Sequence, residues 1–120
     1  MFEIWNDTDL TRLASVKPVS GRVFSQDSSA NKIGVNVYDG GEPVTLSGTV
    51  KANIIKANGE TITVTGNKSG NQAWVVLPAD AYTVVGKIGI YLRIEDGTQV
   101  ITLGGVEGYV YRSQTAILIS

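Results

Sequence analysis

The sequence contains neither cysteine nor histidine. Without cysteine the chain can form no disulfide and no thiolate metal site. Histidine is the commonest general base in enzymes and the commonest metal ligand, so the usual nucleophile–base pairs and imidazole metal sites are excluded as well. We therefore expect the protein not to be an enzyme, and we expect no catalytic, cofactor-binding or metal-binding residues.

Charge of one sign and long apolar runs are also missing. Ten Lys and Arg residues balance eleven Asp and Glu residues, and no basic run marks a nucleic-acid surface. The longest apolar runs, such as 73–77, are far too short to span a membrane. Residues 1–7 lack the basic and apolar regions of a signal peptide. We expect no nucleic-acid partner, no membrane association and no secretion by a signal peptide.

Glycine and β-branched residues are abundant, which is typical of strands joined by tight turns. The clearest predicted strand is 87–95, where apolar and polar side chains alternate. Its apolar face consists of Ile88, Ile90, Leu92 and Ile94. Asp96-Gly97 is a strong hairpin signal, so we expect 98–103 to return antiparallel to this strand.

The same alternation predicts further strands at 32–38, 49–57, 61–65 and 106–112. The apolar run 73–77, which is followed by Pro78, predicts a buried strand. The side chains expected to face inward are Ile33, Val35, Val37, Ile62 and Val64. In 49–57 the apolar face changes between Ile54 and Ile55, which predicts a bulge or burial on both faces. The apolar strand 73–77 predicts that Trp74 belongs to the core. The remaining predictions are a turn at 58–59, a polar loop at 66–71, and single helical turns at 78–83 and 9–15.

Many short strands at this spacing argue for a β-sandwich or a β-barrel. The length of 120 residues fits one domain, so we expect a single domain over 1–120 with a candidate N-terminal arm at 1–19.

Apolar residues at both termini, together with two tyrosines, form a candidate interface. These residues are Phe2, Ile4, Trp5, Tyr109, Tyr111, Ile117, Leu118 and Ile119. Terminal apolar residues of a small β-domain can cover its own core or pair with a neighbouring subunit, and the sequence favours neither. The two tyrosines share the face opposite Val106 and Val110, and one of these two sets should face solvent.

The stretch 37–48, VYDGGEPVTLSG, is a candidate ligand loop because it combines glycines with acidic residues. It lacks the lysine of a phosphate loop, and its acids would repel a phosphate. The segment from Val44 to Gly48 alternates like a strand, whereas a dinucleotide loop opens a helix. The acidic pairs of the chain are Asp7/Asp9, Asp39/Glu42 and Glu95/Asp96. All three lie at predicted turns or at a terminus, so turn chemistry explains them better than calcium binding.

The order of these signals resembles the N-terminal domain family of phage baseplate upper proteins. Residues 31–48 are similar to that family's strand, its D-x-G-x-P-x-x-L-x-G turn and its next strand. Other similar segments are 23–27, 57–59, 77–78, 86–88 and 109–113. The resemblance implies an all-β fold, an Ig-like antiparallel β-sandwich of about 7–9 short strands. In that family the domain usually begins a longer protein, so the resemblance does not imply direct host recognition by this chain.

The resemblance further implies a structural component of a phage or prophage tail baseplate. Such a component would assemble with copies of itself or with other tail proteins, and it would reside in the virion after synthesis in the host cytoplasm. The alternative is a carbohydrate- or host-surface-binding module. That alternative requires a solvent-facing aromatic platform, with Trp5, Tyr109 or Tyr111 beside polar groups.

Overall fold

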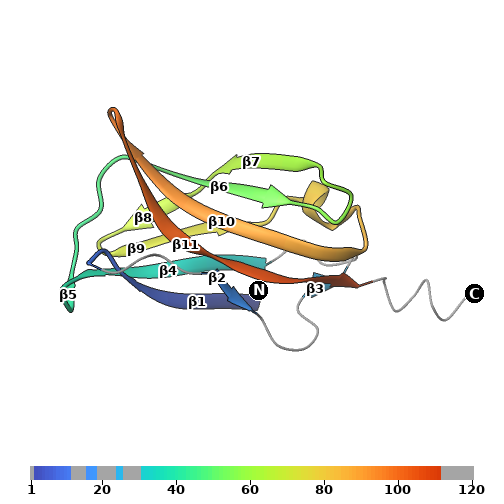
Figure 1. Cartoon of the computed structure of the whole chain (residues 1–120), viewed down its shortest axis with the longest axis horizontal. Helices are drawn as coiled ribbons and strands as arrows, with labels where there is room; N and C mark the ends of the chain where they lie inside the picture. The colour runs from blue at the N-terminus through green and yellow to red at the C-terminus, as the bar shows by residue number, and fades with distance from the viewer. Residues whose placement is uncertain (1, 12–15, 19–23, 26–30, 112–120) are drawn as a thin grey trace, which may run out of the picture.

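Two β-sheets pack face to face around one apolar core (Figure 1). The computed structural model describes residues 2–11, 16–18, 24–25 and 31–111. The strands of sheet A are β1 (Phe2–Asp9), β4 (Asn31–Asp39), β5 (Glu42–Pro43), β8 (Asn67–Ser69) and β9 (Gln72–Val76). The strands of sheet B are β2 (Val16–Pro18), β3 (Phe24–Ser25), β6 (Thr49–Ile55), β7 (Thr61–Thr65), β10 (Gly86–Asp96) and β11 (Gln99–Tyr111). The expected all-β sandwich is confirmed.

Strand order places the first and the last described strands, β1 and β11, in opposite sheets. Sheet A runs β1-β4-β9-β8, with β5 also paired to β4, and sheet B runs β2-β11-β10-β6-β7, with β3 also paired to β11. Most of the strand pairs are antiparallel, but β1 pairs parallel with β4, and β2 and β3 pair parallel with β11. The sandwich is therefore mixed, and its parallel pairs all involve the first three strands, β1, β2 and β3.

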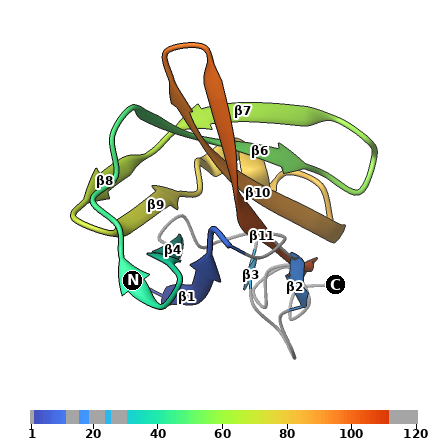
Figure 2. The ribbon, with the colours of Figure 1, turned by 60° about the vertical axis from the view of Figure 1, so that its left-hand side comes forward.

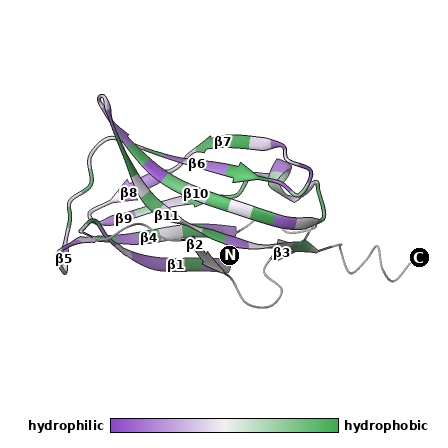
Figure 3. Ribbon diagram, in the orientation of Figure 1, coloured by the Kyte–Doolittle hydropathy of each residue, from purple (hydrophilic) through white to green (hydrophobic). Residues whose placement is uncertain are grey.

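The predicted inward faces form the core. Ile88, Ile90, Leu92 and Ile94 of β10 are at most 1% exposed, and the alternation along this strand is visible in Figure 3. From sheet A, Ile33, Val35 and Val37 of β4 meet them. Ile62 and Val64 of β7 are half-buried and pack against the same core. One buried layer between two sheets is what the alternating pattern predicts.

The β10–β11 hairpin dominates sheet B and rises above the rest of the sandwich (Figure 2). The sequence predicts two strands after the Asp96-Gly97 turn, but β11 runs without interruption from Gln99 to Tyr111. A register shift at Leu92/Arg93 accommodates one extra residue on β11, Leu103. A bulge of this kind bends the strand and increases its twist, so the hairpin can cover the core at one end and project at the other.

The prediction that β6 has a bulge or is buried on both faces is wrong. The pairing of β6 with β10 and with β7 shows no register shift, so there is no bulge. Ile55 is 40% exposed on the outer face, and the next inward position is filled by Lys56, which is only 5% exposed. The Lys56 amino group reaches Asp80 at 3.0 Å and the Thr83 hydroxyl at 2.9 Å. Its long aliphatic stem thus continues the apolar face while its charge is paired.

Two other predictions need correction, and a third is confirmed. The expected loop 66–71 contains strand β8, which pairs with β9. The expected strand 44–48 is irregular after β5, although Val44 and Leu46 still pack against the core. The expected turn at 78–83 is confirmed as the 3₁₀ helix Ala79–Tyr82. It is also the longest helix among the described residues, and it is far too short to cross a membrane.

The segment considered as an N-terminal arm contributes two strands. Residues 2–9 form β1, paired along its whole length with β4, and residues 16–18 form β2. The Thr8 hydroxyl of β1 donates to the Leu103 carbonyl of sheet B at 2.6 Å, which ties the two sheets together. Of the predicted helical turn at 9–15, Asp9 ends β1, Leu10 and Thr11 form a turn, and the rest lies outside the described residues.

Candidate functional site

Strand β1 separates the candidate interface residues onto two faces. Ile4 points inward and packs against the core, as does Thr8, whereas Trp5 lies on the outer face of sheet A. The side chain of Phe2 lies outside the described residues, and so do Ile117, Leu118 and Ile119. Of the N-terminal apolar residues whose side chains are described, Trp5 alone is available as an outer-face contact.

Trp5 belongs to a cluster that we call the tryptophan patch: Trp5, Lys32, Gly34 and Trp74. Trp5 of β1 pairs with Gly34 of β4, and Gly34 pairs with Trp74 of β9, so the three residues form one row across sheet A. The indole rings are tilted by 58° with centroids 6.2 Å apart, and the Lys32 amino group lies 5.2 Å from the Trp74 ring. A tilted ring pair and a cation over an indole face are both favourable arrangements.

Gly34 is what allows the two rings to meet. A Cβ atom at this position would lie 2.6 Å from Cε3 of Trp5, closer than any van der Waals contact allows. Trp5 therefore lies flat on the backbone of β4, and its indole N–H donates to the Glu3 carboxylate at 2.8 Å. The prediction that Trp74 is a core residue is wrong, because Trp74 is half-buried on the outer face beside Trp5.

A polar row borders the tryptophan patch. Asp7, Asn36 and Gln72 lie side by side on β1, β4 and β9, two residues along from the indole row. The Asn36 amide donates to Asp7 at 3.1 Å, and the Gln72 amide donates to Asn36 at 3.1 Å. The outer face of sheet A thus presents two aromatic rings next to planar groups that donate and accept hydrogen bonds.

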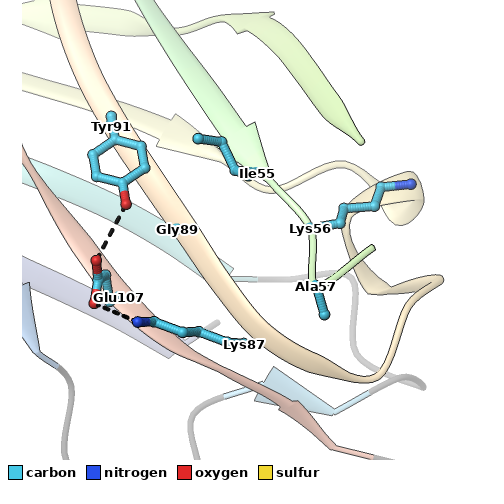
Figure 4. Close-up of a pocket in the computed structure, with 7 residues that line it drawn as sticks. All are labelled: Ile55, Lys56, Ala57, Lys87, Gly89, Tyr91 and Glu107. Atoms are coloured by element: carbon cyan, nitrogen blue, oxygen red, sulfur yellow. Dashed lines mark hydrogen bonds and ion pairs between the residues drawn. The ribbon is translucent and has the colours of Figure 1, made fainter. Parts of the chain in front are cut away.

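Sheet B carries a second cluster, which we call the tyrosine patch: Lys87, Gly89, Tyr91, Gly105 and Glu107. Figure 4 shows all of these residues except Gly105. The Tyr91 hydroxyl donates to Glu107 at 3.3 Å, and the Lys87 amino group lies 3.3 Å from the other oxygen of Glu107. Burial and the nearby Glu107 carboxylate raise the pKa of Tyr91 above its ordinary value. The hydroxyl is therefore a hydrogen-bond donor at neutral pH.

Glycines shape the tyrosine patch as well. A Cβ atom at Gly89 or at Gly105 would lie 2.7 Å from carbon atoms of the Tyr91 ring. The ring consequently lies flat on β10 and β11 and leaves a shallow groove of about 230 Å³ bordered by Ile55 and Ala57 of the neighbouring chain segment. Lys56 also lines this groove, but in Figure 4 its amino group points away from Tyr91.

Of the two C-terminal tyrosines, Tyr109 lies on the outer face of sheet B. Val106 and Val110 are 1% and 2% exposed, and Tyr109 is 51% exposed opposite Lys87 on β10. The tyrosine face of β11 is therefore the outer one. The side chain of Tyr111 lies outside the described residues.

A charged network continues the outer face of sheet B beyond Tyr91. Arg93 donates to the Glu95 carboxylate at 2.9 Å and to the Asn53 side chain at 2.8 Å. Lys51 lies 3.3 Å from the other oxygen of Glu95. Hydrogen bonds from Arg93 and Lys51 hold the pKa of Glu95 below its ordinary value. These charges neutralise one another within the sheet.

The glycine-rich stretch 37–48 is a turn held by the protein itself. Gly40 and Gly41 have φ of +61° and +87°, a left-handed conformation that favours glycine. Their N–H groups donate to the Asp9 carboxylate at 3.0 and 2.9 Å. The Thr11 hydroxyl and backbone N–H also donate to Asp9, and together these bonds hold the pKa of Asp9 well below its usual range. The turn interpretation thus holds, and Asp9 occupies the donors that an external anion would need.

The fold of this chain is similar to that of a solved protein domain. Neither the scan against protein-family models nor the search of curated proteins returns a match. Among solved structures, the N-terminal domain of phage TP901-1 ORF48 superposes with a TM-score of 0.54. The chain shares the fold of a phage protein domain. The alignment covers 95% of this chain and 100% of that domain at 14% sequence identity, so the likeness concerns the fold as a whole.

Proposed function

We propose that this chain is a structural component of a phage or prophage tail baseplate, located in the virion and without enzymatic activity. The observation that carries the proposal is the likeness of fold to a phage protein domain over almost the entire length of both chains. The ordered sequence resemblance to the baseplate upper protein family supports the same class independently of the structure. The role would be to assemble with copies of itself or with other tail proteins.

The outer faces of the sandwich suit such a role. Trp5 and Trp74 on sheet A, and Tyr91 on sheet B, are aromatic side chains held at the surface by defined contacts. Tyr109 of sheet B is an exposed aromatic side chain. Aromatic residues are enriched at protein interfaces because they bury a large area at low cost in side-chain entropy. A rigid sandwich with an aromatic patch on each face can contact neighbours on two sides.

The test is the presence of the chain in particles. Tail particles would be purified from the strain that encodes the chain and labelled with an antibody raised against it, then viewed by electron microscopy. We expect gold label at the baseplate end of the tail and a constant number of copies per particle by quantitative mass spectrometry. Purified particles that lack the chain would refute the proposal.

The carbohydrate-binding alternative is favoured by one observation, the tryptophan patch beside the polar row Asp7–Asn36–Gln72. Aromatic rings can stack on the apolar face of a sugar while amides and carboxylates bond its hydroxyl groups. The test is a glycan array with the wild-type chain and with Trp74→Ala. Glycan binding that Trp74→Ala abolishes would support this second function, and an array without any bound glycan would eliminate it.

A further inference from the structure

The edges of the two sheets are protected unequally. Exposed strand edges invite pairing with other chains, and proteins usually block them with charge, proline or short strands. At the edges of sheet A, β8 has only three residues including Lys68, and β1 carries Glu3, Asp7 and Asp9. At one edge of sheet B, β2 ends in Pro18 and β3 has two residues. The other edge is β7, whose sequence TITVT contains no charge and no proline.

The backbone of β7 has hydrogen-bonding groups that point away from the sheet. The N–H of Gly66 donates to Val50, and the N–H of Lys56 donates to Glu60, both at 2.8 Å. In an antiparallel pair such bonds recur at every second residue, so Ile62 and Val64 bond β6 in the same way. The N–H and C=O groups of Thr61, Thr63 and Thr65 therefore point to the free side. No other described strand pairs with that side, and β7 is the last strand in the order of sheet B, next to β6 (Figures 1 and 2).

We propose that β7 pairs antiparallel with β7 of a second copy of this chain, about a two-fold axis at Thr63. This inference rests on the proposed role in assembly and names its surface and its partner. In this register Thr63 faces Thr63 of the second copy, and Thr61 faces Thr65. Every residue with outward-pointing backbone groups then meets another such residue, whereas a shift of the register leaves some of these groups unpaired.

The side chains of β7 fit the same register. Ile62 would lie opposite Val64 of the second copy on the inner face, at a non-hydrogen-bonded position where side chains approach most closely. Both residues are only half-buried in one copy, so pairing would cover apolar surface that the edge leaves exposed. The threonines would pair with one another on the outer face, and β-branched pairs stabilise adjacent strands.

Charge favours a second copy as the occupant. An isologous contact brings each residue close to its own equivalents, so a charged edge repels itself. Self-pairing of β1 would bring the carboxylates of Glu3, Asp7 and Asp9 together, but β7 has no charge to repel its own copy. Five paired residues make a small contact, so we expect weak pairing in solution that is strengthened when many copies are held in one particle.

The test is a charge exchange at the paired positions, measured by sedimentation equilibrium at protein concentrations up to about 1 mM. We expect the wild-type chain to dimerise as its concentration rises. Thr61→Lys/Thr65→Lys and Thr61→Glu/Thr65→Glu should each dimerise at least about tenfold more weakly, because like charges then face each other. An equimolar mixture of the two variants should form heterodimers, since every new lysine then faces a new glutamate.

Two further variants test whether a loss of dimerisation is specific to the β7 edge. Thr98→Lys/Thr102→Lys adds the same charge on the β10–β11 hairpin and should dimerise like the wild type. Thr63→Pro removes an outward-pointing N–H and leaves the backbone bonds to β6 in place, at the loss of the exposed hydrogen bond from the Thr63 hydroxyl to Asn53. It should abolish dimerisation while circular dichroism stays unchanged. A wild-type chain that stays monomeric, variants that dimerise as strongly as the wild type, or a mixture that forms no heterodimer would each overturn the β7 pairing. Label on tail particles does not depend on this pairing, so the proposed function can fail or hold separately.

Discussion

The outer faces of sheets A and B each contain an aromatic ring packed on a glycine, but the two rings contact different groups. Each lays an aromatic ring flat on a glycine of the neighbouring strand, Trp5 on Gly34 in sheet A and Tyr91 on Gly105 in sheet B. In sheet A the Trp5 ring meets the ring of Trp74, and the Lys32 amino group lies over the Trp74 ring. In sheet B the ring is bonded to the Glu107–Lys87 ion pair, beside the network around Arg93.

The two glycines differ in the atoms that an added side chain would meet. At Gly34 the nearest atoms all belong to the Trp5 side chain, whereas at Gly105 they include a backbone oxygen, that of Ile90. A side chain can rotate away from an added methyl group, but a paired strand cannot. Sheet B should therefore tolerate changes to its outer face less well than sheet A.

The largest expected effect is that of Gly105→Ala. The new Cβ would lie 2.7 Å from Cδ1 of Tyr91 and 2.8 Å from the Ile90 carbonyl oxygen, so strands β10 and β11 would have to shift. We expect the free energy of unfolding to fall by about 2–3 kcal/mol, measured by urea denaturation. In a Tyr91→Ala background most of this loss should persist, because the backbone contact remains. If the Tyr91→Ala background restored the full free energy of unfolding, the conflict at Gly105 would involve only a side chain, as it does at Gly34.

Gly34→Ala should have a smaller effect, a loss of about 1–2 kcal/mol. Its new Cβ conflicts with the Trp5 ring, which lies at the outer surface and can turn away. A double-mutant cycle with Trp5→Ala is the measurement that isolates this conflict. In the Trp5→Ala background, Gly34→Ala should cost almost nothing. An unchanged cost in that background would place the conflict in the backbone of β4 instead.

The polar groups beside the two patches provide a matched pair of variants. Asn53 accepts a hydrogen bond from Arg93 at a partly buried position, whereas the bonds of Asn36 to Asp7 and Gln72 are exposed. Asn53→Ala should cost about 1 kcal/mol, and Asn36→Ala about half of that, in the same denaturation experiment. Equal losses would mean that solvent reaches the Arg93 network as freely as it reaches the polar row of sheet A.

The smallest expected effect is at the turn next to the tryptophan patch, and it depends on pH. The folded-state pKa of Asp9 is lowered, so ionised Asp9 stabilises the fold at pH values above the ordinary carboxyl pKa of about 4. This contribution is lost as the pH falls below that value toward the folded-state pKa. Asp9→Asn should therefore lower the melting temperature at pH 7, and its difference from the wild type should shrink under acidic conditions.

Asp39→Asn is the control for Asp9→Asn. It removes one negative charge from the β4–β5 hairpin that Asp9 contacts but leaves in place the hydrogen bonds from Gly40 and Gly41 to Asp9. We expect its difference from the wild type to vary less with pH than that of Asp9→Asn. A difference for Asp9→Asn that stays constant from pH 7 to acidic pH would contradict the role assigned to its carboxylate.

Much of the fold could be predicted from the sequence, because alternation fixes which side chains share a face. The buried faces of β4 and β10 and the turns at Asn58-Gly59 and Asp96-Gly97 were all predictable in this way. The alternation of apolar and polar residues did not predict burial where the buried residue is charged. Lys56 is buried through its aliphatic stem and its bonds to Asp80 and Thr83, and no sequence pattern identifies such a lysine.

The candidate site could be predicted only in part. Trp5 and Tyr109 were named as candidate interface residues with core and surface positions both left open, and Trp74 was assigned to the core because its strand is apolar throughout. Its true position depends on the pairing of β9 with β4, which sets Trp74 beside Gly34 and Trp5. Gly34, Gly89 and Gly105 look like weak points in strand patterns until the rings that cover them are known.

By itself the sequence determined the all-β class, the inward faces of the main strands and the turns, because these depend on local periodicity and on glycine conformation. The tertiary structure alone decided which strands are neighbours, and therefore which aromatic ring lies on which glycine, where Lys56 finds its partners and which sheet edge is unprotected. Those features arise from contacts between residues far apart in the chain, and local sequence carries no information on the register that brings them together.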